Sequence, residues 1–198
     1  MTVLVLLDTN AYLRFAKRLR PLVGRKFGQR DYELTILKAV EDEVRRSPRL
    51  KFLNPWFEDA DLAQERSAKQ VRLTKDEKAE VEAAQTVLQA HVLDNIESFS
   101  SGQRSPPGDT DCWLLAFAQK REAIVVTDDL GMHTLADDFE LAVWHGYELL
   151  DKLRSAKEAS NALIEEIYAA LEANGDLTAT WREAKYTKFV RVFGKEPK

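Results

Sequence analysis

Hydrophobic positions follow two patterns along this chain: short continuous runs, and positions that recur every three to four residues. A continuous apolar run at residues 3–7 predicts a strand covered on both faces, and residues 32–36, 123–127 and 141–144 predict three further short strands. Apolar positions three and four residues apart predict intervening helices over 9–17, 37–46 and 112–120. Strands and helices in this order predict an α/β fold in which helices flank a central parallel sheet.

Further segments lie between and around these elements. Residues 18–30 are basic and contain proline and glycine, which predicts a loop or a broken helix. Residues 54–105 predict a helical insertion of two helices. Thr74 followed by Glu77 predicts the start of the second helix, because the hydroxyl and the carboxylate can satisfy its opening amides. Residues 98–105 predict a loop before the next helix.

The C-terminal part of the sequence predicts a helical tail. An apolar stripe over 156–171 predicts one helix that ends at Gly175, and a last short helix is expected within 178–198. We therefore expect a first domain at residues 1–150 and a helical C-terminal tail at 151–198.

Composition narrows the class of protein. The chain has 198 residues, of which 44% are hydrophobic, and this is enough to bury a core. No apolar run near the start is long enough to span a membrane, so a cytoplasmic protein without a membrane partner is expected. Cys112 is the single cysteine, which excludes an internal disulfide. The net charge of −4 gives no overall attraction to nucleic acid, so a polyanion would require basic patches and bound metal ions.

Acidic residues stand at the ends of the predicted strands and at the start of a predicted helix. They are Asp8 after the first strand, Asp109 and Asp111 before the helix at 112–120, and Asp128 and Asp129 after the strand at 123–127. Asp109 or Thr110 is expected to cap that helix. Since ligands collect beyond the carboxyl ends of parallel strands, these acids are expected to converge.

Convergent carboxylates need cations. At an effective dielectric constant of about 20, two carboxylates roughly 5 Å apart repel by about 3 kcal/mol. Protons or divalent metal must relieve this repulsion, and oxygen-only ligands suit Mg²⁺ or Mn²⁺. Glu41 and Glu43 lie at the margins of the apolar stripe of helix 37–46, and periodicity does not choose between them.

Four motifs in this order resemble those of a known family. They are Leu6-Leu7-Asp8-Thr9-Asn10, the string Val40-Glu41-Asp42-Glu43-Val44, Asp111 at a helix start, and Val125-Val126-Thr127-Asp128-Asp129. Together they resemble PIN-domain nucleases, and among these the VapC-type toxins of bacteria and archaea, over roughly residues 1–150. The resemblance implies a three-layer PIN-like fold and a metal-dependent endoribonuclease that hydrolyses single-stranded RNA. It also implies a toxin–antitoxin pair as a candidate setting, with an antitoxin-like protein partner and a homodimer.

The resemblance assigns roles to residues. It implies that Asp8, Glu43, Asp111 and Asp129 are the catalytic, metal-binding acids, and that Thr9, Asn10 and Thr127 are polar supports. Asp109 and Asp128 remain open as further ligands, supports or caps. Asp128 is the alternative to Asp129 as a metal ligand, and Glu41 is the alternative to Glu43. Candidate substrate contacts are the basic residues after the first motif: Arg14, Lys17, Arg18, Arg20, Arg25 and Lys26.

Two other classes of function remain. One is a non-catalytic module of the same fold that binds nucleic acid or a protein partner. The other is an aspartate-based phosphatase or receiver-like protein with Asp8 as the phosphoacceptor. Asn10 counts against the phosphatase, because the Asp-x-Asp motif of such enzymes requires a second acid at that position.

Overall fold

The computed structural model describes residues 2–100 and 105–196, and a five-stranded sheet lies at its centre. The strand order is β2-β3-β1-β4-β5. The central β1 (Val3–Leu7) pairs in parallel with β3 (Tyr32–Thr35) and β4 (Ile124–Val126), and β4 pairs in parallel with β5 (Val143–Trp144). The predicted parallel sheet is confirmed.

The sheet has one strand that the sequence pattern missed. β2 (Lys26–Phe27) pairs antiparallel with β3 at one edge, within the segment predicted to be a loop or a broken helix. Two residues are too few to show any periodicity, so this strand is defined only by its pairing with β3.

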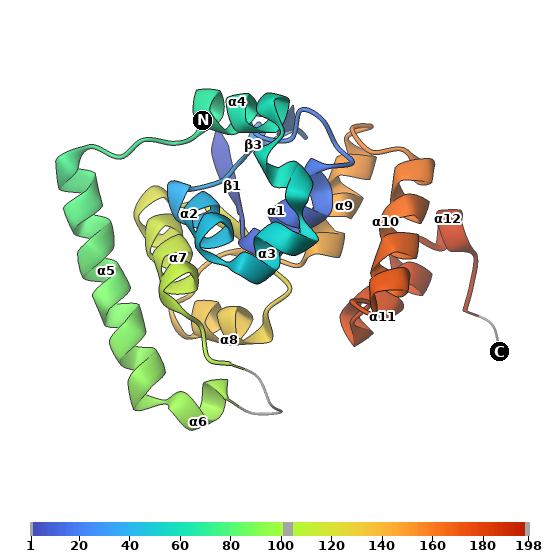
Figure 1. The fold of residues 1–198 in the computed structure, drawn as a ribbon. Helices are drawn as coiled ribbons and strands as arrows, with labels where there is room; N and C mark the ends of the chain where they lie inside the picture. The colour runs from blue at the N-terminus through green and yellow to red at the C-terminus, as the bar shows by residue number, and fades with distance from the viewer. Residues whose placement is uncertain (1, 101–104, 197–198) are drawn as a thin grey trace.

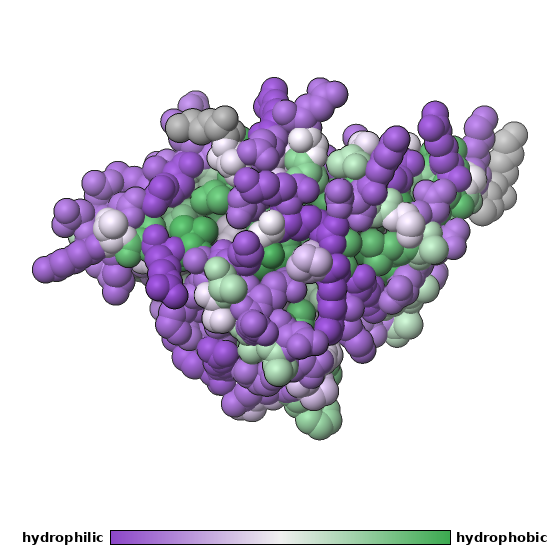
Figure 2. All heavy atoms as spheres, turned by 90° about the horizontal axis from the view of Figure 1, so that it is seen from above, coloured by the Kyte–Doolittle hydropathy of each residue, from purple (hydrophilic) through white to green (hydrophobic). Residues whose placement is uncertain are grey.

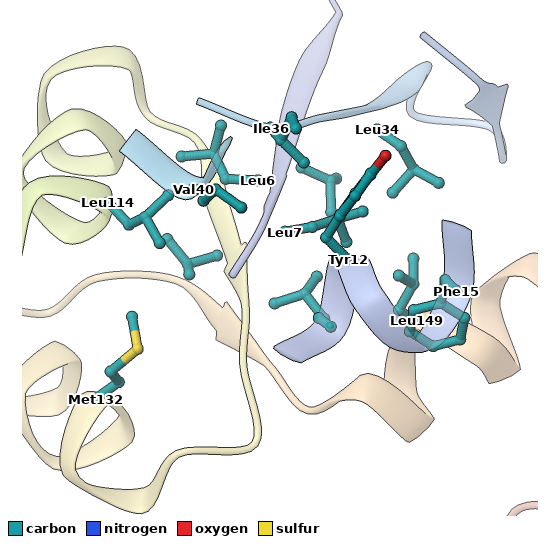
Figure 3. Close-up of a cluster of buried hydrophobic side chains, with 14 of the residues drawn as sticks. Leu6, Leu7, Tyr12, Phe15, Leu34, Ile36, Val40, Leu114, Met132 and Leu149 are labelled. Carbon is teal, nitrogen blue, oxygen red and sulfur yellow. The ribbon is translucent and has the colours of Figure 1, made fainter. Parts of the chain in front are cut away.

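Helices cover both faces of the sheet and complete a three-layer α/β architecture (Figure 1). On one side lies α7 (Asp109–Arg121), with the long α5 (Lys75–Asp94) packed outside it, and α1 (Thr9–Ala16) and α9 (Gly146–Ser155) lie on the other. Figure 3 shows the consequence for the core. Leu7 of β1 lies beside Tyr12 of α1, and Leu114 of α7 lies on the opposite side of the strand.

The segment between the second and third acidic motifs contains more helices than predicted. The predicted helix that begins after Thr74 is confirmed as α5, with its capping box. The other elements are α3 (Pro48–Leu53), η1 (Pro55–Glu58), α4 (Ala60–Lys69) and α6 (Ile96–Phe99). The predicted loop at 98–105 overlaps the end of α6, and residues 101–104 of that prediction lie outside the described residues. α4 corresponds to the first of the two helices predicted within 54–105. The others have four to six residues and are too short for an apolar stripe to mark them.

A buried arginine anchors this segment to the domain. Arg66 of α4 is fully buried and donates hydrogen bonds to Glu41 Oε1 (3.0 Å), the Tyr12 hydroxyl (3.0 Å) and the Phe57 carbonyl (2.8 Å). Its guanidinium also lies 3.9 Å from the centre of the Phe57 ring. These contacts connect α4 to α1, to η1 and to α2 (Lys38–Arg46).

The C-terminal helices pack against the same body. They are α10 (Asn161–Asn174), α11 (Ala179–Thr187) and α12 (Val190–Phe193), and they follow α9, which runs through residue 150. The predicted single helix from residue 156 is wrong, because the chain leaves α9 after Ser155 and Ser160 caps α10. The predicted end at Gly175 is confirmed by its left-handed conformation, with φ of 72°. The domain boundary at residue 150 stays a prediction.

α8 (Leu130–Asp138) follows the acids at the end of β4 and leads to β5. Seen from above, the surface is mainly hydrophilic, with small hydrophobic areas between the polar atoms (Figure 2). Among the described residues, no helix combines the length and the apolar character that a membrane span requires.

Candidate active site

Asp8 lies at the carboxyl end of the central strand and caps the helix that follows. Its Oδ1 accepts a hydrogen bond of 2.5 Å from the Ala11 amide, and the residue is only 5% exposed. Capping and a role in the site are therefore compatible for this residue, because the helix amide occupies only one of its carboxylate oxygens.

Asp111 lies in the first turn of α7. Its Oδ2 accepts a hydrogen bond of 2.9 Å from the Gly108 amide. The helix therefore begins at Asp109 with Gly108 as its N-cap. The expectation that Asp109 or Thr110 caps the helix is wrong. Asp109 accepts a hydrogen bond of 2.9 Å from Gln89 of α5, which makes it a contact between helices.

The two glutamates of α2 point to different neighbours. Glu43 Oε2 accepts a hydrogen bond of 2.5 Å from the hydroxyl of Thr9, the residue next to Asp8. Glu41 is 7% exposed, and its two oxygens accept bonds from Arg66 (3.0 Å) and Arg45 (3.1 Å). In the tertiary structure Glu43 therefore contacts the first motif, whereas Glu41 pairs with two arginines.

Asp129 and Asp128 also separate. Asp129 caps α8, with its Oδ1 accepting a hydrogen bond of 3.0 Å from the Met132 amide. Asp128 lies in a network that the sequence did not reveal, and its charge also raises the pKa of Asp8. Its carboxylate pairs with Arg14 of α1, accepts from the Gly146 amide (3.0 Å) and accepts from Trp181 Nε1 (2.8 Å).

The network around Asp128 joins the C-terminal helices to the carboxyl edge of the sheet. Trp181 is fully buried, and the Arg14 guanidinium lies 4.9 Å from the centre of its ring. A Cβ on Gly146 would come within 2.8 Å of Arg14 and 2.9 Å of Trp181, so only glycine fits there. Burial raises the pKa of Asp128, but the His145 ring, the Arg14 charge, Trp181 and Gly146 outweigh it and hold that pKa below its usual range.

Burial and mutual repulsion make the charged forms of two acids costly. Burial raises the pKa of Asp8 to about 7, against hydrogen bonds from Thr127 and Ala11, and the charges of Asp128 and Asp111 raise it further. Burial also raises the pKa of Asp111 to about 6, with added contributions from the charges of Asp129 and Glu43. These couplings place all four predicted acids in one electrostatic neighbourhood.

The expected polar supports differ in their contacts. Thr9 holds Glu43, as described above. Thr127 is fully buried, and its Oγ1 accepts a hydrogen bond of 3.1 Å from the Asp129 amide. Asn10 is exposed, and no described residue forms a hydrogen bond with its side chain. Two of the three residues are therefore placed to orient the acids.

Most of the basic residues proposed as substrate contacts are already paired. Arg14 pairs with Asp128, and the others pair as Arg18–Glu166, Arg20–Asp59, Arg25–Glu158 and Lys26–Glu33. Among the described side chains, Lys17 alone of the six lacks an acidic partner. The position of these basic residues after the first motif therefore did not show whether their side chains were available to a substrate.

The donor chemistry of the acid cluster fits a hard divalent cation. Its groups are carboxylates and hydroxyls, and a cation would relieve the cost of charging Asp8 and Asp111. Across residues 2–100 and 105–196, however, no three His, Cys, Asp or Glu side chains converge tightly enough to form a ready-made metal site. The four acids are electrostatic neighbours, not a closed ligand shell.

Comparison with known proteins gives two distant structural similarities. No family model and no curated sequence matches the chain. The structure is similar to FitAcB from Neisseria gonorrhoeae, with 16% identity, 72% of this chain and 98% of that chain covered, and a TM-score of 0.44. It is also similar to a structure of FitAB bound to an IR36 DNA fragment, with 16% identity, 72% and 94% covered, and a TM-score of 0.43. Similarity at this level does not carry a functional argument, so the function is argued from the site.

Proposed function

We propose that this protein is a metal-dependent endoribonuclease that hydrolyses phosphodiester bonds of single-stranded RNA. The observation that carries the proposal is that Asp8, Glu43, Asp111 and Asp129, from four separate elements, are neighbours at the carboxyl edge of the sheet. Asp8 caps α1, but capping does not require the burial that raises its pKa to about 7. Perturbed carboxyl groups at such an edge are typical of functional sites.

The four acids would hold Mg²⁺ or Mn²⁺, each contributing carboxylate oxygens. When bound, such a cation lowers the pKa of water and stabilises negative charge on a phosphate. The remaining roles belong to the chain itself. Thr9 fixes the Glu43 carboxylate, and the Ala11 and Met132 amides fix one oxygen each of Asp8 and Asp129. The acids are thus oriented before any ligand arrives, which reduces the cost of ordering them.

Cleavage of a labelled single-stranded RNA by the full-length protein tests the proposal. Wild type is expected to cut in Mn²⁺ or Mg²⁺ and to stop in EDTA, and Asp8→Asn should lose at least 100-fold in rate, as expected when a charge-stabilising group is removed. Asp42→Asn is the matched control, because Asp42 lies on the same helix as Glu43 but pairs with Lys38 on the outer surface. Equal cutting by wild type and Asp8→Asn would refute the proposal.

The same resemblance of motifs leads us to propose a toxin–antitoxin pair as the physiological setting. The expected partner is a small protein encoded next to this one, which on co-expression should form a complex and stop RNA cleavage. Size-exclusion chromatography of the protein alone would test the homodimer. A neighbouring protein that does not bind, or binds without inhibition, would refute this setting without affecting the nuclease.

A further inference from the structure

The end of α2 and the segment that leads to η1 carry a concentration of positive charge. Residues 45–53 contain four basic residues and no acid. Arg45 is used internally, because it pairs with Glu41 and Glu58. The other three, Arg46, Arg49 and Lys51, are exposed, and no acidic side chain among the described residues pairs with them.

The same segment exposes an aromatic side chain. Phe52 is 84% exposed, the highest value among the large hydrophobic side chains of the described residues, and the adjacent Leu53 is 58% exposed. Both belong to α3, which the cap at Ser47 separates from α2. Arg49 precedes them by three and four residues, so these side chains lie on one face of the helix. We call Arg46, Arg49, Lys51, Phe52 and Leu53 the α3 platform.

The α3 platform lies close to the acid cluster along the chain. Phe52 follows Glu43 by nine residues, and nearly all of them are helical. With a rise of about 1.5 Å per helical residue and about 3.8 Å per step at the junction, the two Cα atoms are at most roughly 18 Å apart. A few nucleotides of an extended strand span such a distance.

We propose that the α3 platform binds single-stranded RNA next to the cleavage site, with a base stacked on Phe52 and phosphates held by Arg46, Arg49 and Lys51. This inference rests on the proposed function for its substrate. Two considerations favour RNA over a protein partner. Arg46, Arg49 and Lys51 have no acidic partner among the described residues and lie within six residues of Phe52 in the sequence. The cores of protein interfaces are depleted in charge, whereas sites for single strands combine cations with aromatic rings.

The α3 platform would also supply positive charge for the approach of a polyanion. The net charge of the chain is −4, and the acid cluster itself repels phosphate. A polyanion therefore requires local cations to approach. Base stacking on an aromatic ring tolerates any sequence, since every base has a π face. The platform would supply affinity for unpaired strands and would not select a sequence.

Fluorescence anisotropy with a fluorescein-labelled 12-nucleotide oligouridylate tests the proposal. The full-length protein is used in EDTA, so that binding is measured without metal-dependent cleavage. Phe52→Ala is expected to weaken binding about tenfold, the effect of losing one stacked base. Leu93→Ala is the matched control, because Leu93 is 69% exposed on α5. Phe52→Tyr should bind as wild type does, and Phe52→Leu should bind as weakly as Phe52→Ala.

The cations are tested in the same assay. The double variant Arg49→Gln and Lys51→Gln should make the slope of log affinity against log salt shallower by about 1.4, since each phosphate contact on a single strand contributes about 0.7. The control double variant Arg72→Gln and Lys75→Gln changes exposed cations just before and at the start of α5, the helix that packs outside α7. It should leave the slope unchanged.

Three outcomes would overturn the platform. They are unchanged affinity of Phe52→Ala, wild-type affinity of Phe52→Leu, and a labelled duplex of the same length that binds as tightly as the single strand. The first would exclude Phe52 from RNA binding. Because binding is measured in EDTA, loss of RNA binding in Phe52→Ala supports the platform even if no cleavage is ever observed. Conversely, cleavage with unchanged binding refutes only the platform.

Discussion

Burial of Asp8 has a measurable consequence for stability. Its pKa is about 7 in the folded protein and 3.8 ordinarily. This difference corresponds to about 4 kcal/mol. Because the folded-state pKa is the higher one, the contribution is fully present below pH 3.8 and is lost as the pH rises through 7. About 3 kcal/mol of it should disappear between pH 5 and pH 8.

Asp8→Asn isolates this contribution. The amide is neutral at every pH and its oxygen can still accept the Ala11 amide, because Asn caps helices as well as Asp does. In EDTA at pH 8, we expect the variant to be more stable than wild type by about 2 to 4 kcal/mol. At pH 5 the advantage should shrink by about 3 kcal/mol, since Asp8 is then protonated in the folded wild type.

Urea unfolding followed by tryptophan fluorescence at pH 5 to 8 measures these differences. Asp42→Asn is the control, and it should change the free energy of unfolding by less than about 0.5 kcal/mol, because Asp42 forms only a surface ion pair. Adding Mg²⁺ at pH 8 should stabilise wild type and not Asp8→Asn. A difference between wild type and Asp8→Asn that does not vary with pH would refute the buried, raised-pKa description of Asp8.

Two further substitutions test the tertiary contacts. Trp181→Phe removes the indole donor to Asp128. It should lower the free energy of unfolding by about 1 to 3 kcal/mol and speed hydrogen exchange in α11. Unchanged exchange would contradict the role of Trp181 in attaching the C-terminal helices. Arg66→Met leaves Glu41 buried without its main partner and should cost about 3 to 5 kcal/mol in urea unfolding. Adding Glu41→Leu should recover part of this loss, and no recovery would show that the two side chains are not coupled.

The long elements and their order could be predicted from the sequence. β1, β3, β4 and α5 were recognised because each carries a local signal, either a continuous apolar run or a capping box. The short β2 and α3 were not predicted. They contain two and six residues, which is too few for a period, and β2 is defined by its pairing with β3.

The contacts of neighbouring acids likewise depend on residues far away in the sequence. The sequence placed Glu41 and Glu43 equally at the edge of one stripe, and Asp128 and Asp129 equally after one strand. In the structure Glu41 pairs with Arg66, which is 25 residues away, and Asp128 pairs with Trp181, which is 53 residues away. No local pattern encodes such pairs.

By itself, then, the sequence determined the α/β class, the parallel central strands and the positions at which acidic residues meet the ends of strands. These follow from local patterns of apolar and polar residues, which extend over a few positions. Only the tertiary structure decided which carboxylates face one another, which cations remain unpaired and where the C-terminal helices attach. Those properties depend on burial and charge pairing between segments far apart in the chain, and they exist only once the chain has folded.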